Sequence, residues 1–124
     1  LAMACMSVTI KLVAEWLPTA VLKNNLEQVR EASCDLILLD PQSWVLNNSR
    51  LPRTWQMTSD SISAAVAKEL GAEELVMLKS CLPAESGKDF FDPLFSRFAT
   101  TSTIRIVNLN SSELFEVTYH PQSS

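Results

Sequence analysis

The sequence predicts an α/β fold, a three-layer sandwich in which helices cover both faces of a mainly parallel sheet. Two apolar runs, at residues 35–39 and 75–78, have the continuous pattern of strands that are buried on both faces. Between them, residues 59–70 carry apolar side chains at spacings of three and four, which indicates a helix with one buried face. Strands that alternate with helices form parallel sheets with right-handed crossovers.

The first residues are expected to form an amphipathic core helix that ends at Pro18. Lys11 and Glu15 interrupt the apolar run and no basic leader precedes it, so the pattern does not fit a signal peptide. The run is also too short to cross a bilayer, which takes about 20 apolar residues. The chain opens inside this helix at Leu1, without an initiator Met, which would fit a fragment of a longer protein.

Shorter elements follow in the first half of the chain. We expect a strand at 20–22, a helix capped by Asn24 or Asn25 and running to Ala32, the strand at 35–39 closed by Asp40 and Pro41, and a short helix with a loop up to Pro52. In the second half we expect the helix at 59–70 stopped by Gly71, a strand at 74–79, a polar connection at 81–89, a helix at 93–98, a strand at 103–108 and a last helix at 111–117.

The carboxyl ends of the predicted strands indicate where a ligand would bind. In open parallel sheets ligands lie beyond these ends, which here means near Asp40, near residues 79–82 and near Asn108. Asp60 lies at the amino end of the helix at 59–70 and is expected to face the same edge.

A hydroxyl-rich turn begins the same helix, with Thr58, Ser59, Asp60 and Ser61 in succession. Free backbone N–H groups and the positive end of the helix dipole favour a bound anion such as phosphate at such a position. Arg53 lies just ahead of the turn and is a candidate phosphate partner, because a guanidinium binds phosphate through two parallel hydrogen bonds. The alternative is purely structural: Ser59 caps the helix and Asp60 offsets its dipole.

Composition excludes several classes of site. The formal charge of −4 is spread along the chain, which gives no footprint for a nucleic acid or an anionic membrane. Cys5, Cys34 and Cys81 are far apart and form no CxxC pair, so we expect reduced thiols in a cytoplasmic protein. The single histidine, His120, gives no basis for a zinc site or a histidine-based triad, and no metal ligands are assigned.

Four motifs occur in a fixed order: Thr58-Ser59-Asp60, Leu70-Gly71-Ala72, the strand at 74–79 and Asp92-Pro93. Together they resemble the carboxyl-terminal half of the amino acid kinase superfamily, which includes uridylate kinase, acetylglutamate kinase and aspartokinase. A closer likeness is to the small kinase-like proteins associated with methanofuran and one-carbon cofactor synthesis. Those proteins share W-x-x-T-S-D-S, L-V-x-[LV]-K-S and [VF]-D-P-x-F, which correspond here to residues 55–61, 75–80 and 91–95.

The resemblance implies a single α/β domain over residues 1–124, the carboxyl-terminal part of an amino acid kinase-like fold. It implies a kinase that transfers the γ-phosphoryl group of ATP, with Mg²⁺, to a small acidic or phosphorylated metabolite. Catalysis of this kind is largely positioning and charge neutralisation. By the resemblance, the catalytic residue is Asp60, the substrate-binding residues are Arg53, Thr58 and Ser59, and the nucleotide-binding residues are Lys79, Ser80, Leu82 and Asp92.

The expected partners are therefore ATP and a small-molecule substrate, without a nucleic acid or a membrane, in a homo-oligomer. One feature keeps a second interpretation open. The chain contains only Gly71 and Gly87, so the glycine-rich turn that holds ATP phosphates in the amino-terminal half of the family cannot be built from it. The alternative is a non-catalytic, shortened domain of the same type that binds a metabolite or serves oligomer assembly.

Overall fold

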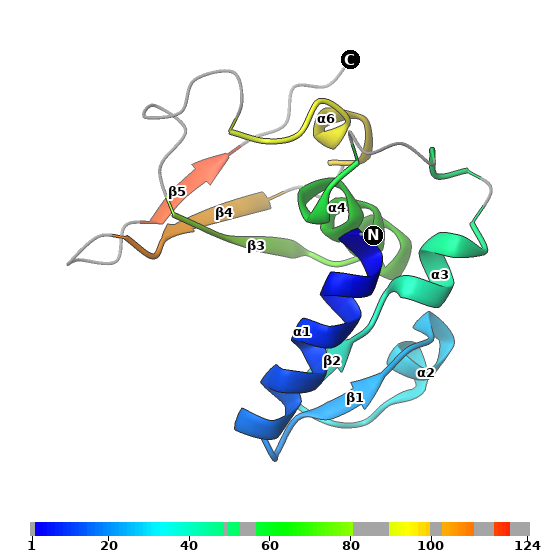
Figure 1. Cartoon of the computed structure of the whole chain (residues 1–124). Coiled ribbons are helices and arrows are strands. Elements are labelled where there is room, and N and C mark those ends of the chain that lie inside the picture. Colours follow the sequence, from blue (N-terminus) through cyan, green and yellow to red (C-terminus); the bar gives the residue numbers. More distant parts are fainter. Residues whose placement is uncertain are drawn as a thin grey trace. The chain divides into compact units, whose positions relative to one another are not determined.

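The computed structural model describes residues 2–48, 50–52, 57–80, 90–99, 103–110 and 116–119. The chain divides into two compact units, Leu1–Arg53 and Thr54–Ser124 (Figure 1). Both units combine helices with parallel strands, so the predicted α/β class is confirmed. A single domain over the whole chain stays a prediction.

The first unit is built around two short parallel strands. Its elements are α1 (Ala2–Trp16), β1 (Val21–Lys23), α2 (Leu26–Glu31), β2 (Ile37–Leu39) and α3 (Gln42–Leu46). β1 and β2 run parallel, with Val21 opposite Ile37 and Lys23 opposite Leu39. α1 packs against β2 and α3, while α2 packs against β1 (Figure 1). The predicted strand–helix–strand order of this half is confirmed.

Local sequence explains where α2 begins. Asn25 is the N-cap residue, and its side-chain oxygen accepts a hydrogen bond of 2.7 Å from the backbone N–H of Glu27. This bond satisfies one of the N–H groups that a helix start leaves without an intrahelical partner. Leu26 is buried beneath the first turn, so the cap and one apolar contact together fix the helix.

The second unit contains a mixed sheet. Its elements are α4 (Ser59–Leu70), β3 (Glu74–Lys79), α6 (Phe95–Phe98), β4 (Thr103–Asn108) and β5 (Glu116–Tyr119). The strand order is β3-β4-β5, with β3 parallel to β4 and β4 antiparallel to β5 (Figure 1). The predicted last helix is wrong at Glu116 and Val117, because these residues pair with β4 as a strand. Residues 111–115 of that prediction lie outside the described part of the chain.

α4 begins and ends where its sequence predicts. Thr58 is the N-cap residue. Ile62 and Ala65 of the predicted apolar face are buried, as are Ala64 and Ala67, whereas Val66 and Leu70 are half-buried. Gly71 ends the helix with a φ of 66°, a left-handed conformation that glycine adopts without the steric penalty of a side chain.

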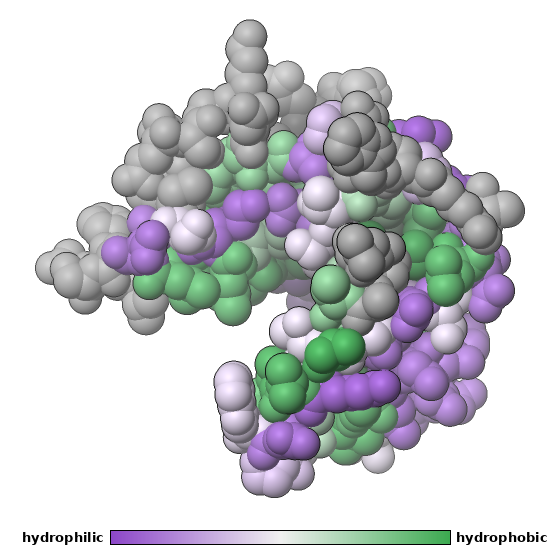
Figure 2. All heavy atoms as spheres, viewed as in Figure 1, coloured by the Kyte–Doolittle hydropathy of each residue, from purple (hydrophilic) through white to green (hydrophobic). Residues whose placement is uncertain are grey.

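The described sheet has one well-buried face. Ile104 and Ile106 of β4 are fully buried with Met77 of β3, whereas Val76 and Leu78 on the opposite face of β3 are exposed. Figure 2 shows hydrophobic side chains at the surface in the region of β3. A sheet covered by helices on both faces is therefore not shown by the described residues.

Candidate functional site

An ion pair joins the end of β3 to the start of α4. Lys79 is the last residue of β3 and Asp60 lies in the first turn of α4. The Lys79 Nζ and Asp60 Oδ2 atoms are 2.9 Å apart, and their side chains are only 19% and 14% exposed. The prediction that Asp60 faces the carboxyl edge of the sheet is confirmed by this contact.

Two aromatic rings also lie close to the Lys79 ammonium. Its Nζ atom lies 5.0 Å from the centroid of the Phe90 ring and 5.5 Å from that of Phe91. The Phe91 ring in turn stacks on Phe95, with 3.9 Å between the centroids. An ammonium at such distances is attracted to the face of an aromatic ring. The position of the lysine is thus set by a carboxylate and two rings.

Asp92, which is distant in the sequence, accepts hydrogen bonds from residues at the amino end of α4. Its Oδ2 atom accepts hydrogen bonds from the Thr58 N–H (3.0 Å), the Thr58 hydroxyl (2.7 Å) and the Ser61 N–H (3.2 Å). Its Oδ1 atom accepts from the Ser61 hydroxyl and from the Leu94 N–H at 2.9 Å. A negative charge that binds the first N–H groups of a helix is also favoured by the helix dipole.

This environment changes the acidity of Asp92. Partial burial disfavours the ionised carboxylate and acts to raise its pKa. The hydrogen bonds from the side chains of Ser61 and Thr58, and from the N–H groups of Thr58 and Leu94, outweigh burial and lower the pKa of Asp92 below its ordinary value of 3.8. The carboxylate is therefore held in its ionised form.

The start of α4 differs from the sequence prediction in two respects. The anion-site hypothesis requires free N–H groups, but those of Thr58 and Ser61 already donate to Asp92. The hypothesis is wrong for these two groups, because the protein supplies its own anion. The N-cap is also Thr58 and not Ser59: the Thr58 hydroxyl accepts from the Asp60 N–H at 3.4 Å.

Asn108 lies beside Lys79 at the same edge. The two residues are opposite each other in the parallel pairing of β3 and β4, and the Leu109 N–H donates to the Lys79 carbonyl at 2.7 Å. Asn108 is 7% exposed, and its Oδ1 atom accepts a hydrogen bond of 3.0 Å from the Asn110 N–H. Sequence reasoning placed this residue at the ligand edge but did not include it in the site.

The structure brings together four of the predicted site residues, in two contacts: Asp60 with Lys79, and Thr58 with Asp92. Ser59 and Ser80 are exposed residues next to these contacts in the sequence. Arg53 and Leu82 lie outside the described residues. Phe90 and Phe91 were missed as site residues because nothing in the sequence relates a pair of phenylalanines to a lysine eleven or twelve positions earlier.

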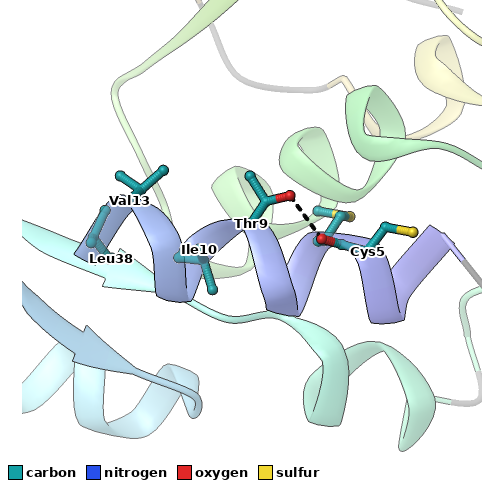
Figure 3. Close-up of a pocket in the computed structure, with 6 residues that line it drawn as sticks. Cys5, Thr9, Ile10, Val13 and Leu38 are labelled. Carbon is teal, nitrogen blue, oxygen red and sulfur yellow. Dashed lines mark hydrogen bonds between the residues drawn. The ribbon is translucent and has the colours of Figure 1, made fainter. Parts of the chain in front are cut away.

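A pocket of about 320 Å³ lies in the first unit, between α1 and β2 (Figure 3). Its lining is formed by Cys5, Met6, Thr9, Ile10, Val13 and Leu38. The lining is almost entirely apolar, and the one hydroxyl in it, that of Thr9, donates to the Cys5 carbonyl at 2.8 Å. The pocket has the volume of a small-ligand site but lacks groups that would orient a polar substrate.

A second polar cluster lies in the first unit, where β2 ends. The buried Ser7 hydroxyl is 2.8 Å from Asp40 Oδ1 and 2.8 Å from Gln42 Oε1. The Gln42 N–H also donates to Asp40 Oδ1, at 3.1 Å. These contacts join α1 to the segment after β2 and involve only neutral donors.

Among the described residues, no group of three or more His, Cys, Asp and Glu side chains is arranged to hold a metal ion. None of the helices in the described part of the chain has the length and apolar character that crossing a membrane requires. Comparison with models of protein families, with curated proteins and with solved structures found no match for this chain. The likeness to amino acid kinases therefore rests on the sequence motifs and stays a prediction.

Proposed function

We propose that the protein transfers the γ-phosphoryl group of ATP to a small acidic or phosphorylated metabolite, within a three-layer amino acid kinase-like fold. The observation that carries the proposal is the 2.9 Å contact between Lys79 and Asp60 at the carboxyl edge of β3. This edge is where open parallel sheets bind ligands. A cation there, held in place by a carboxylate, is what transfer of a phosphoryl group needs.

The chemistry of Lys79 fits this role. An ammonium has three N–H donors, and one is used by Asp60. The others can bind phosphate oxygens, while Asp60 and the rings of Phe90 and Phe91 hold the ammonium in one place. Because the ammonium is largely shielded from water, its attraction to a bound anion is stronger than it would be on an open surface. Asp60 acts by orienting the lysine.

The remaining predicted residues have narrower roles in the proposal. Thr58 and Ser59 border the metabolite, and Ser80 follows Lys79 towards the nucleotide. Asp92 holds the start of α4 and only borders the nucleotide, since its oxygens accept five hydrogen bonds within the protein. Mg²⁺ binds through the phosphates of ATP and water, which suits an ion that keeps several waters. The protein acts in the cytoplasm.

Isothermal titration with Mg·ATP tests the proposal. We expect binding to the intact protein, and a loss of affinity of about tenfold or more in Lys79→Met, because a charge-assisted contact to phosphate is removed. Asp60→Asn is expected to weaken binding less, since the lysine remains but is no longer oriented.

The matched control is Glu74→Gln. Glu74 forms an ion pair with Arg105 at 3.0 Å in the same two strands, but at the opposite end of β3. This variant is expected to bind Mg·ATP as the unmodified protein does. Absence of heat in the unmodified protein, or full affinity in Lys79→Met, would contradict the proposal.

A second candidate is a non-catalytic domain of the same type that serves in a homo-oligomer. Two observations favour it: Asp92 occupies N–H groups that a phosphate would use, and Val8, Leu12 and Trp16 form an exposed apolar row on α1. Residues four apart lie on one helix face, so the row can meet a second copy. Sedimentation of the protein and of Leu12→Glu tests this, with dissociation of an oligomer by the charge as the expected result.

A further inference from the structure

One polar group at the candidate site has no partner within the described protein. The carboxamide oxygen of Asn108 accepts the Asn110 N–H, but the described residues offer no acceptor to its Nδ2 group. Asn108 is 7% exposed, so water has little access to these two N–H donors. An unsatisfied buried donor destabilises a fold by about 1–3 kcal/mol. Such groups are rare in native proteins and require an explanation.

The sheet register places this group beside Lys79. Residues that are opposite each other in parallel strands present their side chains to the same face. Met77 and Ile106 form one such pair and both are buried, and the next pair along the same face is Lys79 with Asn108. The unpaired amide and the ammonium therefore lie on one face at one strand end, where Asp60 also approaches.

The alternative explanation is that Asn108 only ends the strand. Its bond to the Asn110 N–H is a common turn arrangement for asparagine. Aspartate serves the same turn, because the bond requires an acceptor and not a donor. The turn accounts for the carboxamide oxygen and leaves the Nδ2 group unexplained.

We infer that Asn108 is a ligand-binding residue of the Lys79 site, whose Nδ2 group donates to a phosphate oxygen of the bound nucleotide or substrate. The inference rests on the proposed function, since it requires a phosphate at this edge. The ammonium supplies charge and the amide supplies direction, so the two donors bind different oxygens of one phosphate group. A neutral amide in this position adds specificity without a further charge.

Two measurements test the inference. The first follows the side-chain NH₂ signals of Asn108 in a ¹⁵N-correlated NMR spectrum of the intact protein, assigned by their absence in Asn108→Asp. We expect them to shift on addition of Mg·ATP, while those of the exposed Asn110 stay in place. A parallel titration with inorganic phosphate separates a nucleotide phosphate from a free one.

The second measurement is the affinity of two matched variants. Asn108→Asp keeps an oxygen for the Asn110 N–H and loses the donor, and we expect it to bind Mg·ATP about tenfold more weakly or worse. Asn110→Asp makes the same chemical change two residues away and is expected to bind as the unmodified protein does.

The outcomes separate the inference from the proposed function. Binding of Mg·ATP without a shift of the Asn108 signals overturns the inference and leaves the kinase proposal intact. Absence of any binding to the unmodified protein overturns both. If Asn108→Asp does not fold, the NH₂ signals of the unmodified protein still decide between these results, with their assignment taken from Asn108→Ser.

Discussion

The two units of the chain each place a carboxylate at the end of a parallel strand, but the surroundings differ. In the first unit, Asp40 follows β2 and accepts hydrogen bonds from the neutral Ser7 hydroxyl and Gln42 N–H. In the second unit, Asp60 faces the end of β3 and contacts the ammonium of Lys79. At one strand end the carboxylate is therefore bound by neutral donors, and at the other it is paired with a cation.

The two strand ends differ in whether a cation is held beside the carboxylate. At the end of β2, the Ser7 hydroxyl has a single hydrogen and two acceptors at 2.8 Å, and among the described residues no cation pairs with Asp40. At the end of β3, donors remain on Lys79 and on the amide of Asn108. The second unit is thus the one in which a carboxylate at the strand end holds a cation in place.

The largest change in the free energy of unfolding is expected when the carboxylate is removed from one unit at a time. Comparing the two variants tests the difference between the units directly. Asp92→Ala leaves four donor groups at the start of α4, and the Leu94 N–H, without their acceptor, and we expect the free energy of unfolding to fall by about 3 kcal/mol or more. Asp40→Ala removes two hydrogen bonds and is expected to lower it by about 1.5 kcal/mol.

Urea unfolding at neutral pH measures both changes. Asp92→Asn is the control, since it keeps one carboxamide oxygen as an acceptor and should fall between Asp92→Ala and the unmodified protein. A loss for Asp92→Ala no larger than that for Asp40→Ala would show that the distant carboxylate does not hold α4.

A double-mutant cycle on the charged pair should give a smaller effect. The combination of Asp60→Asn and Lys79→Met is expected to show a coupling free energy of about 1–2 kcal/mol, because both charges are largely shielded from water. The pair of Glu74 and Arg105, with side chains 40% and 35% exposed, serves as the reference and should show less than about 0.5 kcal/mol. Equal coupling free energies in both cycles would mean that shielding from water does not strengthen the Asp60–Lys79 ion pair.

The sequence predicted those parts of this fold that depend on local patterns. The apolar spacing of 59–70 and the stop at Gly71 predict α4, and the cap of α2 lies within two residues of the group it binds. The meeting of Asp60 with the end of β3 also follows, because a helix that precedes a parallel strand begins at that strand's carboxyl edge.

Contacts between distant segments could not be predicted. Asp92 binds groups that precede it by 31 and 34 residues, and its sequence context of Phe91 and Pro93 contains no capping signal for α4. The helix expected at 111–117 is wrong at Glu116 and Val117 for a similar reason: Glu116 to Tyr119 forms a strand because β4 offers a pairing edge, which is a tertiary effect. The features set by residues close in the sequence could therefore be predicted, and those set by contacts between distant segments could not.

Lowering the pH is expected to reduce the free energy of unfolding, because Asp92 becomes protonated. This reduction should be smaller than the one caused by Asp92→Ala. The pKa of Asp92 is lower in the folded protein than in the unfolded chain, so its ionised form stabilises the fold. This contribution is complete above the ordinary pKa of 3.8 and is lost as the pH falls through the lower pKa of the folded state. The stability difference between the unmodified protein and Asp92→Asn should therefore narrow in acid.

Urea unfolding over a series of acidic pH values measures this narrowing. Gly71→Ala is the control, because the strain of a side chain at a φ of 66° does not involve a titrating group and should lower stability equally at every pH. A constant difference between the unmodified protein and Asp92→Asn would show that the hydrogen bonds at α4 do not favour the ionised carboxylate.

The smallest loss of stability is expected at the Ser7, Asp40 and Gln42 cluster of the first unit. Ser7→Ala removes one buried hydroxyl and should lower the free energy of unfolding by about 1 kcal/mol, since Asp40 keeps the hydrogen bond from the Gln42 N–H. Affinity for Mg·ATP should not change, because the donors assigned to the anion belong to the second unit. Titrations of Ser7→Ala and of Lys79→Met with Mg·ATP, done in parallel, measure this difference in affinity. Equal losses of affinity would place the anion at both strand ends, and the pairing of a carboxylate with a cation would no longer identify the site.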